Sequence, residues 1–555
     1  FMSTRGYGVF VNTTYRINYD IGSRSLMTAS LMIDDPRLDL FLIYGPALKE
    51  VLARYEEITG WPSLPPKESF GIWHTPPRWV SMEEYDKGVD AVVAAGEKFR
   101  ELDIPVDYFM VVWMTLGSIS TGPEEAKELS QRLGKLGIKA GIYVAPLLNV
   151  GTPLEREARQ HGYALRRADG SPYEIPLGYK TEKGERGETE YSMAVLDRDD
   201  AWRDRHNRTF YGPCLMPDFT NPDAVKWWKG KIIALLKAGA FAVGMSDFGE
   251  DVPADACFHN GRSGLEMHNL YTLLYQKATY EAVAEGTSHR GLTNARSGTA
   301  GMQRFPICWS GDPNCDWRDF IANMRAGLSI GLSGVPFWSC DNGGYHAGMG
   351  NLTPELWIRW TQWSMFESHV RLHGTPPTRV PWTFGDRAVE NFRKYAKLRY
   401  RLLPYIYSTA HEATKTGLPM MRAMVLEFQG DTNTHNIDDQ YMFGDAFLVA
   451  PVYTPANKRS VYLPAGTWFD YWTGEAHEGP ATLDVTPPPE VLPLYVRADS
   501  IVAMGPDMAY VGEKPFDPIT LDVWLQSSAE CTIYDDDETV MCRATRKKGE
   551  VVLTA

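Results

Sequence analysis

The stretch FAVGMSDFGE, residues 241–250, decides the fold because it holds a short apolar strand that ends directly in acidic residues. Apolar runs of similar length recur on both sides of it, with amphipathic helical patterns between them. Near-continuous apolar strands that alternate with helices are typical of a parallel sheet covered on both faces. The other runs are FGIWH (70–74), PVDYFMVVW (105–113), IKAGIYVAP (138–146), GLTNARS (291–297), FPICWSGD (305–312), GVPFWSCDNGG (334–344) and FESHVRLHG (366–374).

These eight strand units predict a closed (β/α)8 barrel of the α/β class rather than an open sheet. We place the barrel at residues 61–410, with a polar inserted loop near 176–213. Short strands with Pro and Gly turns flank it and predict β-sandwich domains. The end of an N-terminal sandwich is expected at 1–60, a proximal C-terminal sandwich at 411–502, and the start of a distal β domain at 503–555.

The overall charge and the cysteines argue against several classes of protein. A net charge of -14 argues against binding of nucleic acid or of an anionic membrane surface. No apolar run reaches the roughly 18 residues that a membrane-spanning helix needs. The seven cysteines are scattered without a CxxC pair, which favours free thiols in a reducing compartment over disulfides or a zinc cage. We therefore expect a cytoplasmic protein, while a leader ahead of residue 1 stays open.

Polar side chains end five consecutive strands of the predicted barrel. A single Asp after a strand is usually a helix N-cap, but repetition over five strands favours one shared site, because functional groups of such barrels gather at the C-terminal rim. Paired carboxylates with guanidinium, imidazole and indole groups are suited to cleaving a glycosidic bond. The side chains are Asp247, Arg296, Trp309, Asp312, Asp341, Arg371 and His373.

Metal catalysis is disfavoured by the sequence. His369 and His373 have the i, i+4 spacing of a zinc pair, but no third ligand stands nearby, and no HExxH motif is present. We expect neither a metal nor another cofactor. The expected partner is a carbohydrate substrate, and the sequence leaves a homo-oligomer open.

Several motifs carry a resemblance to a known family. They run in order from the first residues to about residue 505, and they include RGYGVFVN, LPPKESFGIW, PDFTNPDAVKWW, SDFGED, ARSG, FPICWSGD, SHVRLHG and QYMFGDAFLVAPV. The sequence resembles glycoside hydrolase family 31, and within it the bacterial α-xylosidase branch.

The resemblance implies a retaining α-glycosidase that removes a terminal, non-reducing α-linked sugar. Asp247 matches the family nucleophile and Asp312 the general acid/base. The same resemblance implies that Arg296, Asp341 and His373 hold the sugar, that Trp309 and Trp73 line the pocket, and that Arg371 orients the carboxylates. For Trp73 a plain core role, and for Arg371 a structural ion pair, remain alternatives. Asp218 is expected to cap the helix that begins near Pro222.

Two departures from the family pattern concern specificity. This chain has Val111, Val112 and Trp113 where the family usually places an Asp, and Met245-Ser246 where the branch tends to have Lys-Thr. Because a site built to hydrogen-bond a hydroxyl discriminates strongly, these changes predict an altered sugar preference. An α-xylosidase or α-glucosidase is expected, with an α-galactosidase or a transglycosylase as the alternative. A non-catalytic carbohydrate-binding homologue is disfavoured because both carboxylates are present.

Overall fold

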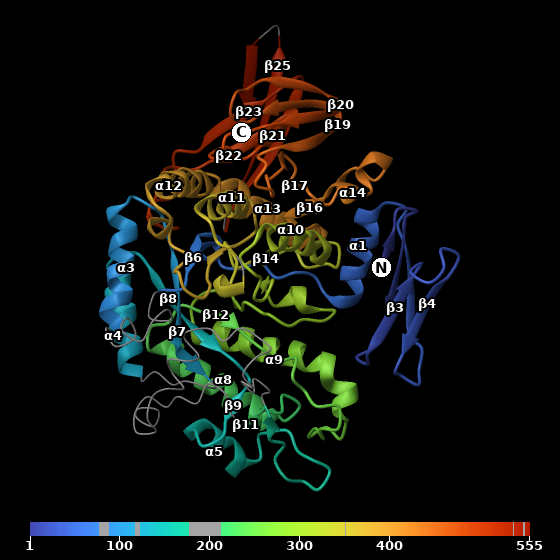
Figure 1. The fold of residues 1–555 in the computed structure, drawn as a ribbon, viewed down its shortest axis with the longest axis vertical. Helices are drawn as coiled ribbons and strands as arrows, with labels where there is room; N and C mark the ends of the chain where they lie inside the picture. The colour runs from blue at the N-terminus through green and yellow to red at the C-terminus, as the bar shows by residue number, and fades with distance from the viewer. Residues whose placement is uncertain are drawn as a thin grey trace.

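The computed structural model describes residues 1–76, 88–116, 123–176, 213–349, 351–536, 538–547 and 550–554. It has a central α/β part with β-rich parts at both ends of the chain (Figure 1). The C-terminal strands lie at one end of the long axis, and the N-terminal strands lie at the side of the central part (Figure 1). Apart from its first and last residues, the insert predicted at 176–213 lies outside the described residues, as do the side chains of residues 112–125.

The central part is a closed barrel of parallel strands, as the sequence predicts. One sheet has the order β12-β8-β7-β6-β15, and β13 pairs with β14. Parallel bridges from Ser246 to Ala295, from Ala295 to Cys308, and from Asp341 to Arg371 close the ring. The strands are β6 (Ile72–His74), β7 (Tyr108–Leu116), β8 (Lys139–Val144), β12 (Val243–Ser246), β13 (Cys308–Trp309), β14 (Trp338–Ser339) and β15 (Val370–Leu372).

Helices follow the barrel strands, and most begin where a side chain satisfies a free backbone N–H. Ser263, Asp316 and Thr353 each accept a hydrogen bond from the N–H three residues further on. The helices are α3 (Val89–Glu101), α4 (Pro123–Gly134), α5 (Pro153–His161), α8 (Pro222–Lys237), α9 (Gly264–Gly286), α10 (Trp317–Gly331), α11 (Pro354–Ser364), α12 (Asp386–Arg401) and α13 (Leu403–Thr416). A small antiparallel sheet of β9 (Leu148–Asn149), β10 (Ile175–Pro176) and β11 (Pro213–Leu215) follows β8.

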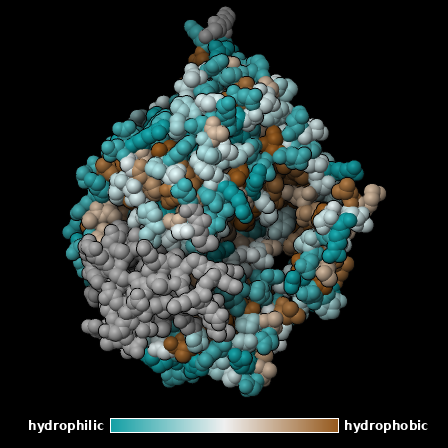
Figure 2. All heavy atoms as spheres, viewed as in Figure 1, coloured by the Kyte–Doolittle hydropathy of each residue, from teal (hydrophilic) through white to brown (hydrophobic). Residues whose placement is uncertain are grey.

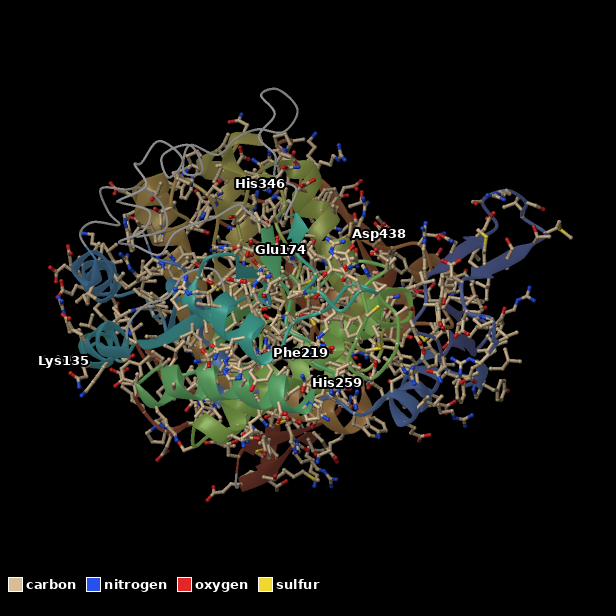
Figure 3. The ribbon with its side chains drawn as sticks, turned by 90° about the horizontal axis from the view of Figure 1, so that it is seen from below. Lys135, Glu174, Phe219, His259, His346 and Asp438 are labelled. Atoms are coloured by element: carbon tan, nitrogen blue, oxygen red, sulfur yellow. The ribbon has the colours of Figure 1, made fainter. Side chains whose placement is uncertain are left out.

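The cap expected of Asp218 is wrong. Asn221 caps α8 by accepting a hydrogen bond from Asp223 N, and Pro222 occupies the first turn. Asp218 instead accepts hydrogen bonds from Thr220 N at 2.9 Å and from His259 N at 2.6 Å. It therefore joins the turn before α8 to the loop before α9. Phe219 and His259 accordingly lie close together in Figure 3.

The β-rich parts are antiparallel. In the N-terminal part, β1 (Met2–Ser3), β2 (Tyr7–Val11) and β5 (Leu40–Tyr44) form one sheet, and β3 (Ile17–Ile21) pairs with β4 (Ala29–Ile33). The C-terminal part has a six-stranded sheet of β16 (Met421–Ala423), β17 (Tyr441–Phe443), β18 (Phe447–Val449), β21 (Leu494–Arg497), β19 (Arg459–Asp470) and β20 (Ala476–Val485). Beyond it lie the pair β22 (Ser500–Met504) and β23 (Thr520–Trp524), and the sheet of β24 (Ser528–Asp535), β25 (Glu538–Lys547) and β26 (Glu550–Thr554).

Buried aromatic residues fill the space between the barrel and its helices. Trp357, Trp360 and Trp363 of α11 are completely buried, which places much of the tryptophan content in the core. Hydrophilic residues predominate on the face shown in Figure 2, with hydrophobic residues in small groups. All seven cysteines are free thiols, as expected, although Cys257 is exposed. Within the described ranges, no helix is long and apolar enough to cross a membrane.

An isolated carboxyl lies where α1 (Leu48–Thr59) packs on the barrel. Glu56 is fully buried, and its side chain lies against Gly334 and Gly417, where an added Cβ would come within 2.6 Å and 2.7 Å of it. Neither carboxylate oxygen has a hydrogen-bond partner among the described residues. Burial raises the pKa of Glu56 to about 8, and the nearby Gln303 amide opposes the rise. The Glu56 carboxyl therefore remains protonated near neutral pH.

Glu56 should make the protein less stable as the pH rises. Between its ordinary pKa of 4.5 and about 8, the folded state holds one more proton than the unfolded state. The contribution of protonated Glu56 to the free energy of unfolding is fully present below pH 4.5 and is lost as the pH rises through about 8. Thermal melting from about pH 5 to about pH 9 should therefore show a smaller fall in Tm for Glu56→Gln than for the unmodified protein. The neighbouring exposed Glu57 provides the control, Glu57→Gln, and equal slopes for both variants would contradict the interpretation.

Candidate active site

The turn after β12 places Asp247 at the rim of the barrel. Phe248, the next residue, has a φ of 58°, which is uncommon for a side chain of this size, and Gly249 has a φ of 105°, a conformation that favours glycine. This turn brings Phe248 N to 2.9 Å from Asp247 Oδ1, where it donates a hydrogen bond. The chain thus adopts a costly backbone conformation directly beside the carboxylate, as happens at functional sites.

Three groups hold the Asp247 carboxylate. Besides Phe248 N, Arg296 Nη1 lies 2.9 Å from Oδ1, and the Tyr143 hydroxyl donates to Oδ2 over 2.6 Å. Arg296 follows the extended segment at Ala295, and Tyr143 lies in β8, so two other strands of the barrel contribute to the contact. Asp247 is 9% exposed, so the carboxylate remains within reach of a ligand.

Arg296 is shared between two carboxylates. Its guanidinium forms ion pairs with Asp247 and with Glu250, and it lies 4.1 Å above the ring of Phe248. Burial acts to lower the pKa of Arg296, but the charges of Asp247 and Glu250 outweigh it and raise that pKa. Arg296 is therefore a permanent positive charge at the rim. Its Nε is buried without a hydrogen-bond partner in the described part of the chain.

Asp312 differs from Asp247 in its surroundings. It follows β13 on a turn at Gly311, whose φ is 75°, and none of the described residues donates a hydrogen bond to its carboxylate. The surrounding protein and then the charge of Asp247 raise the pKa of Asp312 to about 6, although the residue keeps access to solvent. Arg296 and Arg371 oppose the rise. Two carboxyl groups in one site thus have different surroundings, and the pKa of Asp312 is raised.

A second cluster joins Asp341, Arg371 and Trp309. Asp341 and Arg371 are bridged across neighbouring strand ends and are almost completely buried. Arg371 Nε donates to Asp341 Oδ1 at 2.8 Å, and the guanidinium lies 4.6 Å from the Trp309 ring centroid. Burial raises the pKa of Asp341, and Arg371 opposes the rise.

Each member of this cluster keeps a polar atom without a partner. Asp341 Oδ2, Arg371 Nη1 and Trp309 Nε1 are all buried and make no hydrogen bond within the described ranges. Such atoms are costly unless a ligand or water satisfies them. One acceptor and two donors close to each other suit a polyhydroxylated ligand. The charge of Asp312 contributes to the raised pKa of Asp341, so this cluster lies near the carboxylates described above.

The remaining two predicted residues lie on neighbouring strands. His373 is buried, and its Nδ1 lies 2.7 Å from Thr75 Oγ1. Burial and then the charges of Arg371 and Arg379 lower the pKa of His373 well below its usual value, so the ring is neutral. Trp73 is 1% exposed, donates its indole N–H to Ser69 O at 2.7 Å, and packs on Tyr108. Contact of Trp73 with a sugar stays a prediction.

The structure brings together residues that the sequence pointed to and adds others. Asp247, Arg296 and Asp312 adjoin one another, and the Arg371 cluster adjoins Asp312. Tyr143 and Glu250 were missed as members of the site. The signal for Glu250 was its place in the SDFGE turn, and the only signal for Tyr143 was a polar tip near the end of an apolar strand. In the described ranges, no group of three or more His, Cys, Asp and Glu side chains is arranged to hold a metal ion.

The barrel and the carboxyl groups on its rim define the class of protein, which is that of barrel glycoside hydrolases. Residues 62–409 match the family model of the glycosyl hydrolases family 31 TIM-barrel domain, and residues 417–502 match that of the glycosyl hydrolase family 31 C-terminal domain. The chain therefore belongs to glycoside hydrolase family 31.

The similar proteins include enzymes named as glycosidases and enzymes named as transferases. The α-xylosidase XylQ of Lactiplantibacillus pentosus is 33% identical over 100% of this chain and 70% of its own length. The isomaltosyltransferase of Sporosarcina globispora is 30% identical over 92% of this chain and 48% of its own. The cycloalternan-forming enzyme of Listeria monocytogenes has a TM-score of 0.85 at 27% identity, with 98% of this chain and 53% of that chain covered. The chain thus spans between about half and 70% of the lengths of these proteins.

Asp312 should titrate near pH 6, and the charge of Asp247 should account for part of that value. Replacing Asp247 by Asn removes a negative charge and frees Arg296, so the pKa of Asp312 should fall toward its ordinary value. The pKa of Asp312 is measured by infrared titration of protein with isotope-labelled carboxyl groups. Subtracting the spectra of Asp312→Asn isolates the signal of Asp312. Glu250→Gln should lower the pKa less, because Glu250 makes the smaller contribution. An unchanged or higher midpoint in Asp247→Asn would show that the two groups are not coupled.

Proposed function

We propose that the chain is a retaining α-glycosidase that hydrolyses a terminal, non-reducing α-linked sugar, of the α-xylosidase or α-glucosidase type. The observation that carries the proposal is the contrast between two carboxyl groups on one rim. Asp247 is held by a cation and two hydrogen-bond donors, whereas Asp312 has a pKa raised to about 6. Retaining glycosidases need one ionised and one protonated carboxyl group, and their environments set these states.

In the proposed reaction, Asp247 attacks the anomeric carbon while Asp312 gives its proton to the glycosidic oxygen. The bond from the anomeric carbon to the leaving oxygen breaks, and a covalent glycosyl ester of Asp247 forms. Asp312, now ionised, takes a proton from water, and the water oxygen displaces Asp247 from the anomeric carbon. Two displacements restore the original anomeric configuration.

The Arg371 cluster and His373 are proposed to bind the sugar itself. Asp341 Oδ2 is an acceptor, and Arg371 Nη1 and Trp309 Nε1 are donors, for ring hydroxyls. The Trp309 ring is suited to packing against the C–H groups of a pyranose, and His373 is a neutral ring beside these residues. Val111, at the position where the family usually places an Asp, contributes no polar side-chain atom, in line with an altered preference among sugars.

Transglycosylation is the second candidate because relatives named as transferring or cycloalternan-forming enzymes match nearly the whole of this chain. The glycosyl-enzyme would form in the same way, and a sugar hydroxyl would replace water in the second step. Product analysis at increasing concentrations of acceptor sugar distinguishes the two reactions. Transfer products that dominate at low acceptor concentration would favour this second candidate.

Replacing Asp247 by Ala should abolish turnover. A panel of 4-nitrophenyl α-glycosides of xylose, glucose, galactose and N-acetylgalactosamine identifies the sugar that the unmodified protein cleaves. On that substrate, Asp247→Ala should lower kcat by about 10⁴-fold or more, because the covalent route is lost. Added azide should restore release of nitrophenol and give the β-glycosyl azide. Asp438→Ala, which removes an exposed aspartate paired with Arg325, serves as the control. Near-normal activity in Asp247→Ala would overturn the proposal.

A further inference from the structure

Tyr143 is the one hydroxyl group that the structure places on the Asp247 carboxylate among the described residues. It lies next to the last residue of β8 and donates to Asp247 Oδ2 over 2.6 Å. A bond of this length to a carboxylate is in the range of the strong, charge-assisted O–H···O⁻ contacts. The tyrosine side chain comes from a strand that pairs with β12, so the barrel itself fixes its distance from Asp247.

The two oxygens of Asp247 are engaged unequally. Oδ1 forms the ion pair with Arg296 Nη1 and accepts a hydrogen bond from Phe248 N, both at 2.9 Å, whereas Oδ2 contacts only the Tyr143 hydroxyl within the described part of the chain. A carboxylate oxygen has two lone pairs available for such contacts, so Oδ1 has two close partners, whereas Oδ2 keeps one lone pair without a partner in the described part of the chain. Oδ2 is therefore the oxygen that is able to form a bond to carbon.

Tyr143 donates its hydrogen bond to Asp247 as a neutral phenol. Burial, and then the negative charge of Asp247, raise the pKa of Tyr143 well above its usual value. The phenol therefore keeps its proton at any pH at which the protein is active. It offers one hydrogen bond to Oδ2, and the strength of that bond depends on how much negative charge Oδ2 carries.

We propose that Tyr143 is a positioning residue that stabilises Asp247 as the leaving carboxylate when the glycosyl-enzyme is hydrolysed. The proposal rests on the retaining mechanism proposed above. In that step, the oxygen of water bonds to the anomeric carbon, and the bond from that carbon to Asp247 Oδ2 breaks. The electron pair of the broken bond returns to Oδ2, where the Tyr143 hydroxyl donates to it. The proton of water goes to Asp312.

The two half-reactions depend on this hydrogen bond in opposite ways. Before attack, Oδ2 shares the negative charge of the carboxylate and loses it toward the transition state, so the hydrogen bond stabilises the starting state more than the transition state. In the ester, Oδ2 carries little charge and gains it toward the second transition state. Only an interaction that is stronger in the transition state accelerates a step. Tyr143 therefore assists hydrolysis of the ester and does not assist its formation.

Tyr143→Phe tests this directly, because it removes the hydroxyl and keeps the ring. With the 4-nitrophenyl α-glycoside that the unmodified protein cleaves, kcat should fall roughly ten- to a hundredfold, which is the worth of a hydrogen bond to a charged group. KM should fall in proportion, so that kcat/KM changes by no more than about threefold. Stopped-flow measurements should show a burst of nitrophenol. Intact mass spectrometry after an acid quench should show the chain carrying one glycosyl unit.

Two further measurements separate this role from a merely structural one. Tyr275→Phe also removes a buried hydroxyl, but one that donates to Val144 O at 3.1 Å, so it should give neither a burst nor a glycosylated chain. Azide should raise kcat of Tyr143→Phe, because a stronger nucleophile speeds only the second step. Unchanged kinetics, or a fall in kcat/KM without accumulation of the ester, would overturn the role of Tyr143. Such results would leave the proposed function intact, since that depends on Asp247→Ala.

Discussion

The charge of one arginine organises the candidate site. Arg296 is the cation that the structure pairs with Asp247, and it divides its guanidinium between Asp247 and Glu250. Asp312 lies close enough to be influenced by the same charges but has no ion-pair partner among the described residues. The effects of the surrounding protein and of the charge of Asp247 are therefore only partly offset, and the pKa of Asp312 rises. The positive charge at the rim is thus concentrated on Asp247, and the pKa of Asp312 is raised, as a general acid requires.

The closed barrel makes this distribution possible. Parallel strands end on the same rim, so β8, β12, the segment at Ala295 and β13 bring Tyr143, Asp247, Arg296 and Asp312 together although they lie far apart in the sequence. The strained turn at Phe248 and Gly249 adds a backbone donor to Asp247. On the next strands, Arg371 contacts Asp341 and Trp309, and each of these three side chains keeps one buried polar atom without a partner in the described part of the chain.

Much of this arrangement could be predicted from the sequence because it follows from strand periodicity. The apolar runs fixed the strands, and the polar residues directly after them had to meet at the rim. Other features depend on contacts that no local pattern reveals. Tyr143 reads as a core residue of an apolar strand, and only the register between β8 and β12 brings it to Asp247. Glu56 reads as the solvent-facing side of an amphipathic helix, and only the packing against Gly334 and Gly417 buries it. Asp218 and Asn221 are both good caps three residues apart, and local sequence does not choose between them.

The proposed mechanism requires that Asp247 and Asp312 act on one sugar in two successive displacements. The anomeric configuration of the first-formed product reports this most directly. Proton NMR spectra, recorded within seconds of mixing the protein with the α-glycoside that it cleaves, resolve the two anomers before mutarotation. Two displacements predict that the α anomer of the free sugar appears first and that the β anomer forms later by mutarotation. A β anomer as the first product would mean a single displacement by water, and it would contradict the assignment of Asp247 as nucleophile.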